Sequence, residues 1–287
     1  LNEIFFKDLE LRKPDYYLNV NTSSLGHMLG ETLIKIEEVL DKENPDAMLI
    51  LGDTNASIAA IMAKRKHIPI YHMEAGNRSF DENVPEETNR RMIDHIADFN
   101  LVYTENSRRH LISEGLPHRR IYLTGSPLYE VLKYYYPKIQ NSQILNSLQL
   151  EPHKYFLVSV HREENVDYQE NLKKISIVLN RLAEQYNYPI IVSTHPRTRK
   201  RLESLDSFAF NPLIQFQKPF SYTDYNFLQM NATCVISDSG TISEESAILK
   251  FPAITIRNSL ERPEAIDAGT IILSGFEPEI VLDSVKV

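Results

Sequence analysis

The chain has 287 residues, of which 42% are hydrophobic and 24% are charged, a composition typical of a soluble globular protein with room for two domains. Its net charge of −8 argues against the basic face that nucleic-acid binding requires, although a local basic pocket for a phosphate stays open. No apolar run approaches the roughly 20 residues of a membrane span, so we expect no membrane partner.

The single cysteine, Cys234, lies in the apolar stretch 232–236 and is predicted to be a buried core thiol rather than a nucleophile. A lone cysteine forms no disulfide within the chain, which fits a reducing cytoplasm, where we expect the protein. Apolar residues at helical spacing already occur in residues 2–9, and residues 280–287 begin a further helical pattern. We therefore expect a fragment that is truncated at both ends.

The first half of the chain alternates predicted helices and strands. Helices are predicted over residues 25–42, 56–64 and 86–96, and strands over residues 47–51, 69–73, 99–103 and 120–123. Strands that alternate with helices indicate a parallel sheet.

The second half repeats this pattern. Strands are predicted over residues 155–160, 189–194, 213–216, 234–237 and 253–256, and helices over residues 171–185, 222–230 and up to residue 249. Residues 127–153, with a Tyr-Tyr-Tyr-Pro run and a segment rich in Gln, Asn and Ser, form the best boundary. We predict two Rossmann-like α/β domains, residues 1–137 and 138–287, with a cleft between them.

The richest candidate site follows the strand 69–73. Residues 71–78 and 84–90 bring together three carboxylates, two arginines and a glycine, which are Glu74, Glu86, Glu87, Arg78, Arg90 and Gly76. Ligands of open α/β sheets bind beyond the carboxyl ends of the strands, so we look for the chemistry here first.

Residues 238–245, Asp-Ser-Gly-Thr-Ile-Ser-Glu-Glu, follow an apolar strand and open a helix. The free N–H groups of a helix N-terminus favour an anion, and Ser239, Gly240 and Thr241 let a diphosphate approach the backbone. A plain helix cap by Ser239 or Thr241 explains the same residues about equally well. Glu245 is either an acceptor for ribose hydroxyls or an ordinary first-turn carboxylate.

Basic residues follow two other strands of the second half. His161 and Arg162 end its first strand, where an imidazole can act as acid or base and an arginine can hold phosphate, although a lone histidine is more often structural. Arg262, in Glu-Arg-Pro-Glu after the strand 253–256, either pairs with a phosphate or forms a surface ion pair.

Gly52-Asp53-Thr54 is similar to the start of a metal-binding phosphoesterase motif. Residues 55–57 supply no carboxylate or histidine ligand, and the other histidines lack metal-ligand spacing. We therefore expect neither a metal nor a cofactor.

Seven motifs occur in order along almost the whole chain: Gly-Asp-Thr (52–54), His-Met-Glu-Ala-Gly-Asn-Arg (72–78), Pro-Glu-Glu-Thr-Asn-Arg (85–90), Thr-Gly-Ser-Pro (124–127), His-Arg-Glu (161–163), Asp-Ser-Gly (238–240) and Glu-Arg-Pro-Glu (261–264). Together they resemble the non-hydrolysing UDP-N-acetylglucosamine 2-epimerases. Such a long ordered series is far more specific than any one of its motifs.

The resemblance implies a glycosyltransferase-B-like fold, with UDP held mainly by residues 138–287 and the sugar acted on by residues 1–137. It also implies that C2 is inverted by elimination of UDP to a 2-acetamidoglycal and re-addition of UDP. The implied catalytic residues are Asp53, Glu74, Glu86 and His161. The implied substrate-binding residues are Arg78, Arg90, Arg162, Ser239, Gly240, Thr241, Glu245 and Arg262.

Within the family, the variants Glu-Ala-Gly-Asn-Arg, Thr-Gly-Ser-Pro and Ser-Gly-Thr-Ile-Ser-Glu-Glu look most like the branch that makes UDP-N-acetyl-L-fucosamine for capsule or O-antigen. The glucosamine branch more often has Leu at the position of Asn77 and Gly at that of Thr241. The alternative is therefore the conversion of UDP-GlcNAc to UDP-ManNAc. We expect a homodimer in either case.

Three rival functions stay open. A glycosyltransferase on the same fold would need an acceptor site and would not require three carboxylates at the sugar end. A hydrolysing 2-epimerase would release free sugar and UDP. A catalytically silent nucleotide-sugar-binding module gains weight because the family's first strand, its Gly-Thr-Arg-Pro-Glu loop and its C-terminal helix are not seen here. We accordingly expect weak binding or low activity from the chain as given.

Overall fold

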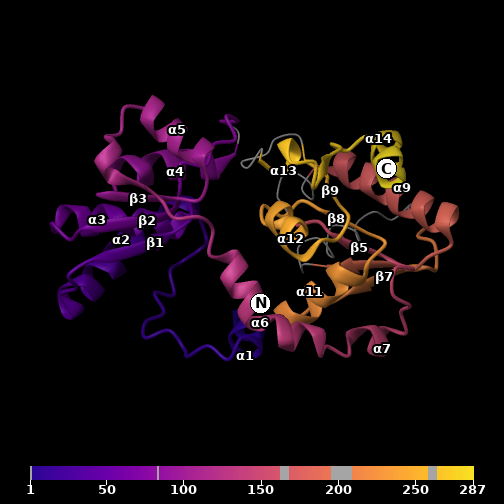
Figure 1. Cartoon of the computed structure of the whole chain (residues 1–287). Helices are drawn as coiled ribbons and strands as arrows, with labels where there is room; N and C mark the ends of the chain where they lie inside the picture. The colour runs from indigo at the N-terminus through magenta and orange to yellow at the C-terminus, as the bar shows by residue number, and fades with distance from the viewer. Residues whose placement is uncertain (1, 83, 162–167, 195–208, 258–263) are drawn as a thin grey trace. The chain divides into compact units, whose positions relative to one another are not determined.

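The computed structural model describes residues 2–82, 84–161, 168–194, 209–257 and 264–287 (Figure 1). It divides into two compact units. Pro14–Pro127 form the four-stranded unit, and Leu1–Lys13 together with Leu128–Val287 form the six-stranded unit. No helix of the described residues combines the length and the apolar character that crossing a membrane would take.

The four-stranded unit has a parallel sheet in the order β1-β2-β3-β4. Its strands are β1 (Met48–Leu51), β2 (Ile70–Ala75), β3 (Phe99–Val102) and β4 (Ile121–Leu123). Its helices are α2 (Leu25–Glu43), the 3-10 helix η1 (Asn55–Ala59), α3 (Ala60–Arg65), α4 (Pro85–Ile96), α5 (Glu105–Ser113) and the 3-10 helix η2 (His118–Arg120). The strand order follows the chain order, as expected for successive βα units.

Local sequence explains the ends of these helices. The side chain of Ser24 accepts a hydrogen bond from the backbone N–H of His27 and so caps α2, which ends where Asn44 adopts a left-handed conformation. Pro85 occupies the first turn of α4, where its missing N–H is not needed. Apolar residues of α2, α3 and α4 pack with β1 and β2 in one core cluster.

The six-stranded unit has a parallel sheet in the order β10-β9-β8-β5-β6-β7. Its strands are β5 (Phe156–Ser159), β6 (Ile190–Ser193), β7 (Ile214–Gln217), β8 (Cys234–Ser237), β9 (Ala253–Thr255) and β10 (Ile272–Leu273). Its helices are α1 (Asn2–Asp8), α6 (Leu128–Gln140), α7 (Ile144–Leu148), α9 (Gln169–Tyr186), α11 (Tyr222–Asn231), α12 (Ile242–Leu249), α13 (Glu264–Asp267) and α14 (Pro278–Lys286). The strand order reverses between β5 and β8, which makes this the topological switch point of the sheet.

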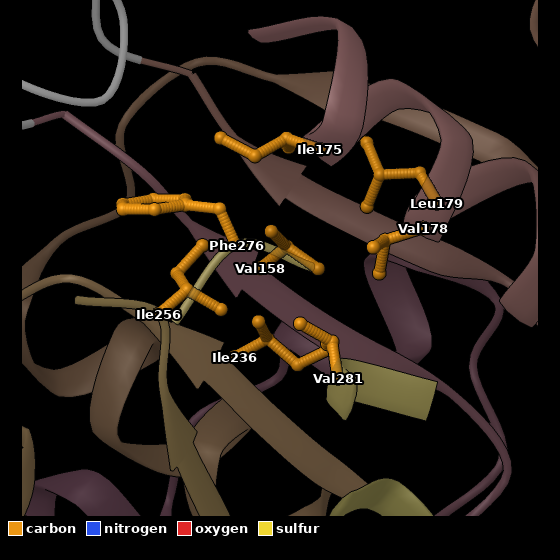
Figure 2. A pocket seen from close by; sticks show the side chains of 8 residues that line it. All are labelled: Val158, Ile175, Val178, Leu179, Ile236, Ile256, Phe276 and Val281. Carbon is orange, nitrogen blue, oxygen red and sulfur yellow. The ribbon is translucent and has the colours of Figure 1, made fainter. Parts of the chain in front are cut away.

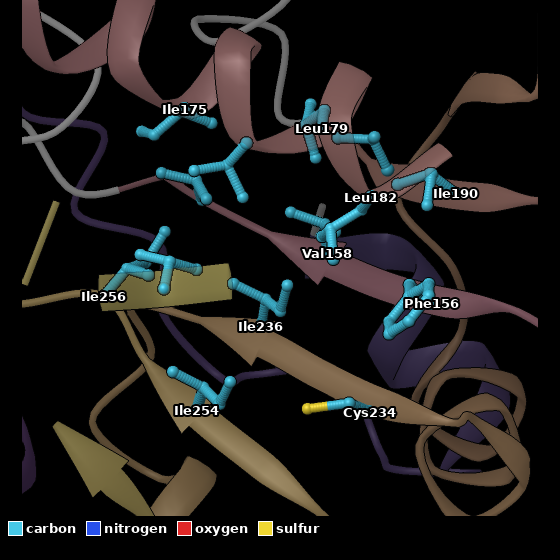
Figure 3. Close-up of a cluster of buried hydrophobic side chains, with 14 of the residues drawn as sticks. Phe156, Val158, Ile175, Leu179, Leu182, Ile190, Cys234, Ile236, Ile254 and Ile256 are labelled. Carbon is cyan, nitrogen blue, oxygen red and sulfur yellow. The ribbon is translucent and has the colours of Figure 1, made fainter. Parts of the chain in front are cut away.

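Both faces of this sheet are covered. Phe156 and Val158 of β5 belong to one core cluster, and Leu157 belongs to the cluster on the opposite face. Figure 3 shows the first cluster, with Ile175 and Leu179 of α9 among its residues. Strands that are buried on both faces have continuous apolar runs, which is why the sequence shows little alternation here.

The apolar packing of this cluster leaves a cavity of about 10 Å³ beside β5, β8 and β9 (Figure 2). It is lined by Val158, Ile175, Val178, Leu179, Ile236, Ile256, Phe276 and Val281. Cys234 lies in the same core, where burial raises the pKa of its thiol to about 12. The prediction of a buried core thiol is therefore confirmed.

The compact units differ from the expected domains in two places. Leu128 begins the six-stranded unit rather than residue 138, because α6 and α7 lie within the expected boundary region 127–153 and α6 packs on α11. Helix α1 also belongs to this unit. The Asp8 carboxylate accepts hydrogen bonds from the backbone N–H and hydroxyl of Thr223, each at 2.8 Å, and the Tyr135 hydroxyl donates to the Leu9 carbonyl at 2.6 Å. These partners lie more than a hundred residues from α1, so its helical periodicity could not reveal them.

Candidate active site

Strand β2 ends in a strained backbone at Glu74. Its pairing with β3 shifts register between Met73 and Ala75, and Glu74 has a φ of 67°, in the left-handed region that side chains disfavour. The Glu74 carboxylate lies close to Gly52, since its Oε2 is 3.6 Å from where a Cβ of that residue would stand. Strain of this kind persists where the surrounding structure holds it, and it often marks a functional site.

Asp53 follows β1 and pairs with α4. Its Oδ2 accepts hydrogen bonds from Arg90 Nε at 2.9 Å and Nη2 at 2.7 Å. The side chain of Asn89 also reaches the loop after β1, where it donates to Asn55 at 3.0 Å. Glu86 lies three residues before Asn89 and four before Arg90, and therefore on the same face of α4. Asp53 and Glu74 thus lie at the carboxyl ends of β1 and β2, and Glu86 lies on the face of α4 that contacts Asp53 and Asn55.

The neighbouring carboxylate, Glu87, has a different role. It is buried, and it accepts hydrogen bonds from the Ser79 backbone N–H at 3.0 Å, the Ser79 hydroxyl at 3.1 Å, Arg90 at 3.0 Å and Arg91 at 3.1 Å. Burial by itself would raise the pKa of Glu87, but the hydrogen bonds from Ser79 and Arg91 and the charge of Arg90 outweigh it and lower the pKa. Glu87 therefore ties Ser79 to α4, while Glu86 remains half-exposed.

Arg78, expected to bind substrate, is committed within the protein. Its side chain is 1% exposed, and its Nη1 donates to Asp94 at 2.7 Å and to the Asn77 carbonyl at 2.6 Å. Its Nε and Nη2 donate to Glu114 at 2.8 Å and 2.7 Å. These contacts support a role in anchoring the loop after β2 rather than a direct contact with substrate. Arg90 is also buried and holds Asp53 through the pair described above.

His72 and Asp94 were not among the predicted site residues, yet they form a buried pair that contacts Gly52 and Gly76. His72 is fully buried, with Nδ1 2.8 Å from Asp94 Oδ1 and Nε2 3.0 Å from the Gly52 carbonyl oxygen. The backbone N–H of Gly76 also donates to Asp94, at 3.2 Å. Asp94 could have been predicted from the spacing of polar residues 87, 90 and 94 along α4, because intervals of three and four residues place them on one face of the helix, which is buried.

A second group of predicted residues meets at the switch point of the six-stranded unit. The backbone N–H of His161 donates to the buried Asp238 carboxylate, at 3.0 Å to Oδ2. His161 Nδ1 lies 3.0 Å from Asp238 Oδ1, and its side chain is 47% exposed. The contact fixes one edge of the imidazole ring and leaves Nε2 directed away from Asp238.

The turn after β8 is linked to Glu245 by hydroxyl groups. Ser239 Oγ lies 3.0 Å from Thr241 Oγ1, which donates to Glu245 Oε1 at 2.7 Å. Gln229 of α11 donates to the other carboxylate oxygen at 2.7 Å. Desolvation raises the pKa of Glu245, against the effect of these two hydrogen bonds. Thr241 makes no capping hydrogen bond to α12, so the hydroxyl organises Glu245 instead.

A pocket of about 300 Å³ opens beside these residues, within the six-stranded unit. It is lined by Phe5, Ser159, His161, Ser193, Pro219, Phe220, Tyr222, Tyr225, Asn226 and Glu245. Ser159, His161 and Ser193 come from the carboxyl ends of β5 and β6, where ligands of open α/β sheets bind. Its aromatic and hydroxyl-bearing walls suit a flat polar ring and a sugar.

The remaining predicted residues are placed as follows. Gly240 lies half-buried in the turn between Ser239 and Thr241. Arg162 and Arg262 fall outside the described residues. Within the described ranges, no three His, Cys, Asp or Glu side chains are grouped so as to hold a metal ion.

A family model for UDP-N-acetylglucosamine 2-epimerase matches residues 1–287, the full length of the chain. The chain belongs to the UDP-N-acetylglucosamine 2-epimerase family. This confirms the expected family and the expected class of enzyme, an isomerase.

Relatives of this epimerase family support the assignment. A UDP-N-acetylglucosamine 2-epimerase from Methanococcus maripaludis is 38% identical to this chain. The match covers 100% of this chain and 80% of the relative. Among solved structures, that of UDP-N-acetylglucosamine 2-epimerase from Rickettsia bellii is 50% identical with a TM-score of 0.90, over 99% of this chain and 76% of that one. The Methanocaldococcus jannaschii enzyme, in complex with UDP-GlcNAc and UDP, is 37% identical with a TM-score of 0.92, over 99% and 80% of the two chains.

The epimerase fold extends beyond the family. A trehalose 6-phosphate synthase from Burkholderia multivorans matches with a TM-score of 0.59 at 11% identity, which shows a common fold alone. The two parallel sheets and these neighbours confirm the expected glycosyltransferase-B-like α/β fold.

Proposed function

We propose that the chain is a UDP-N-acetylhexosamine 2-epimerase that inverts C2 by eliminating UDP and adding it back. The observation that carries this proposal is the placement of Asp53 and of the backbone-strained Glu74 at the ends of neighbouring strands beside Gly52, with Glu86 on the face of α4 that contacts Asp53. Moving a proton on and off both faces of a carbon needs more than one acid–base group. A glycosyltransferase on the same fold has no such need.

The proposed reaction has two balanced halves. A carboxylate takes the C2 proton, the C2–H electron pair forms the C1=C2 double bond of a 2-acetamidoglycal, and the C1–O bond breaks to release UDP. A carboxylic acid then delivers a proton to the opposite face of C2, and a phosphate oxygen of UDP attacks C1. C2 is not bonded to a carbonyl carbon, so its proton cannot be removed by simple enolisation.

The six-stranded unit supplies the nucleotide-binding groups in this proposal. The pocket beside β5 and β6 would accept uridine, and Glu245 would accept hydrogen bonds from the ribose hydroxyls. His161, held by Asp238, would donate to the departing diphosphate, and the backbone N–H groups of Ser239 and Gly240 would bind it. Donors aimed at the charge that develops on UDP would lower the barrier to elimination.

For the sugar, we propose the branch that forms UDP-N-acetyl-L-fucosamine. Support comes from Asn77 and Thr241, the two positions that distinguish the branches, because each contacts a proposed site carboxylate, Glu74 and Glu245 respectively. A 31% identical relative from Pseudomonas aeruginosa is a UDP-2,3-diacetamido-2,3-dideoxy-D-glucuronate 2-epimerase, so the sugar varies among relatives at this distance. The alternative substrate pair, UDP-GlcNAc and UDP-ManNAc, is favoured by the names of other relatives.

The proposed setting is a homodimer in the bacterial cytoplasm that supplies capsule or O-antigen synthesis. A nucleotide-sugar substrate and a reduced, buried Cys234 are consistent with that compartment.

Incubation with candidate UDP-N-acetylhexosamines in D₂O tests the activity. Deuterium at C2 with the UDP-sugar retained is the expected result, and a comparison of UDP-GlcNAc with UDP-N-acetyl-L-fucosamine decides the sugar. Release of free sugar would instead indicate a hydrolysing epimerase, and tight UDP binding without exchange would indicate a silent binding module.

Carboxylate variants test the site in the same assay. Asp53→Asn, Glu74→Gln and Glu86→Gln should each lower kcat by about 10² to 10⁴-fold, the usual contribution of general acid–base groups, with little change in UDP affinity. Glu38→Gln, an exposed carboxylate on α2, is a matched control that should leave both quantities unchanged. Near-normal turnover in any of the three would remove that residue from the proposed chemistry.

A further inference from the structure

Asn77 connects Glu74 to helix α5 through a chain of side-chain hydrogen bonds. Its Nδ2 donates to Glu74 Oε1 at 3.3 Å, and its Oδ1 accepts from the Ser107 hydroxyl at 3.1 Å. The Ser107 hydroxyl accepts in turn from Thr104, the residue that caps α5, at 3.1 Å. Asn77 and Ser107 are 5% and 3% exposed, so the hydrogen bond between these two side chains is shielded from water.

The backbone around Asn77 is fixed against the same helix. Gly76 lies so close to α5 that an added Cβ would stand 2.4 Å from the Ser107 carbonyl oxygen. The Gly76 carbonyl oxygen also lies 3.0 Å from His110 Nδ1. Helix α5 is thereby a rigid support for the segment that carries Glu74.

From this arrangement we infer that Asn77 is a positioning residue, which sets the orientation of the Glu74 carboxylate toward the sugar. The inference rests on the proposed function, in which Glu74 exchanges a proton with C2. The Asn77 side chain is held at Oδ1 by Ser107, so its N–H group points to one place and favours one rotamer of Glu74. Proton transfer requires the two atoms to be within hydrogen-bond reach, and small misplacements of a catalytic group lower the rate steeply.

A residue that merely fills the loop would show different behaviour. Loss of a structural Asn77 would destabilise the four-stranded unit and affect turnover whether or not Glu74 is present. Loss of a positioning Asn77 lowers kcat only as long as Glu74 is there to be positioned. A double-mutant cycle between the two residues separates these cases.

The variants are Asn77→Ala, which removes both hydrogen bonds, and Asn77→Asp, which keeps the acceptor for Ser107 and lacks the N–H that serves Glu74. We expect Asn77→Ala to lower the rate of C2 exchange in D₂O about tenfold, the scale of one hydrogen bond to a charged group, and Asn77→Asp to lower it further through repulsion. The affinity for UDP should stay within twofold of the parent. In a Glu74→Gln background, neither change should lower the remaining rate again.

If the Asn77 variants unfold, Ser107→Ala provides a second test, because it removes the hydrogen bond that holds Asn77 Oδ1 and leaves the hydrogen bond between Asn77 and Glu74 in place. It should lower exchange by a few-fold, again only when Glu74 is present. Urea unfolding of each variant shows which samples are folded at the assay temperature.

The outcomes distinguish this inference from the proposed function. If Glu74→Gln abolishes exchange while the Asn77 and Ser107 variants keep the parent rate, Asn77 has no positioning role. Equal losses in the presence and absence of Glu74 would also overturn it, in favour of a structural role. Full exchange by Glu74→Gln itself would instead refute the assignment of Glu74 within the proposed function.

Discussion

Replacement of Gly76 by alanine should be among the most damaging single changes in the four-stranded unit. Gly76 has a φ of 80°, and a Cβ at this position would lie 2.4 Å from the backbone oxygen and 2.9 Å from the backbone carbon of Ser107. Neither atom belongs to a flexible side chain, so α5 or the loop after β2 must move.

The magnitude follows from comparison with Gly115. That residue has a φ of 88° and no atom within 4 Å of an added Cβ, so Gly115→Ala bears only the left-handed backbone cost of about 1–2 kcal/mol. Gly76→Ala bears the same cost. A shift of its loop also weakens the bonds of Gly76 to Asp94 at 3.2 Å and to His110 at 3.0 Å, which adds about 1–3 kcal/mol. We expect a total loss of about 2–5 kcal/mol.

Urea denaturation followed by circular dichroism measures both variants against the parent. The expected result is a free energy of unfolding about 2 kcal/mol lower for Gly76→Ala than for Gly115→Ala. C2 exchange should fall in Gly76→Ala at temperatures where it is still folded, because Glu74 lies two residues away. Equal losses of stability in the two variants would show that the contact with Ser107 is relieved at no cost, and the account of the rigid loop would fail.

Three further predictions concern stability. Hydrogen bonds from Arg78 lower the pKa of Glu114 in the folded protein. The stabilisation they give is therefore complete above pH 4.5 and is lost as the pH falls through the lowered pKa of the folded state. Glu114→Gln should reduce the free energy of unfolding by about 2 kcal/mol at pH 7 and flatten this acid dependence in urea titrations. Desolvation raises the pKa of Glu245, so its charge destabilises the fold above pH 4.5, and Glu245→Gln should raise the melting temperature at pH 7 while weakening UDP binding measured by calorimetry. Val281 lines the existing cavity, so Val281→Ala should lower the free energy of unfolding by about 2–3 kcal/mol. The neighbouring Ile280 is exposed, so Ile280→Ala should lower it by less than about 0.5 kcal/mol.

The amino-acid sequence by itself determined the βα alternation and the strand ends at which polar residues gather. Apolar runs such as those of β5 and β8 and the helical spacing of α2 and α9 are local patterns, because strand and helix periods appear within a few residues. The turn after β8 could be read as an anion site for the same reason, since its Ser, Gly and Thr are contiguous.

Other features depended on contacts between distant residues. Two adjacent glutamates, Glu86 and Glu87, look equivalent in the sequence, yet one is half-exposed and the other is buried against Ser79 and Arg90. Arg78 was predicted to bind substrate, and its buried hydrogen bond to Glu114, 36 residues away, could not be predicted from the local sequence. The adjacency of a carboxylate and an arginine in the sequence does not determine in which direction either side chain points.

The tertiary structure also decided which segments act together. His161 meets Asp238 across 77 residues because β5 and β8 are neighbours in the sheet, and α1 joins the six-stranded unit through contacts with α6 and α11. Strand order and helix docking are chosen by the burial of whole surfaces, which sums over many residues and has no local signature. The sequence predicted which chemical groups the candidate site contains. Packing between distant residues determined which of these groups are buried, which are exposed, and which neighbours orient them.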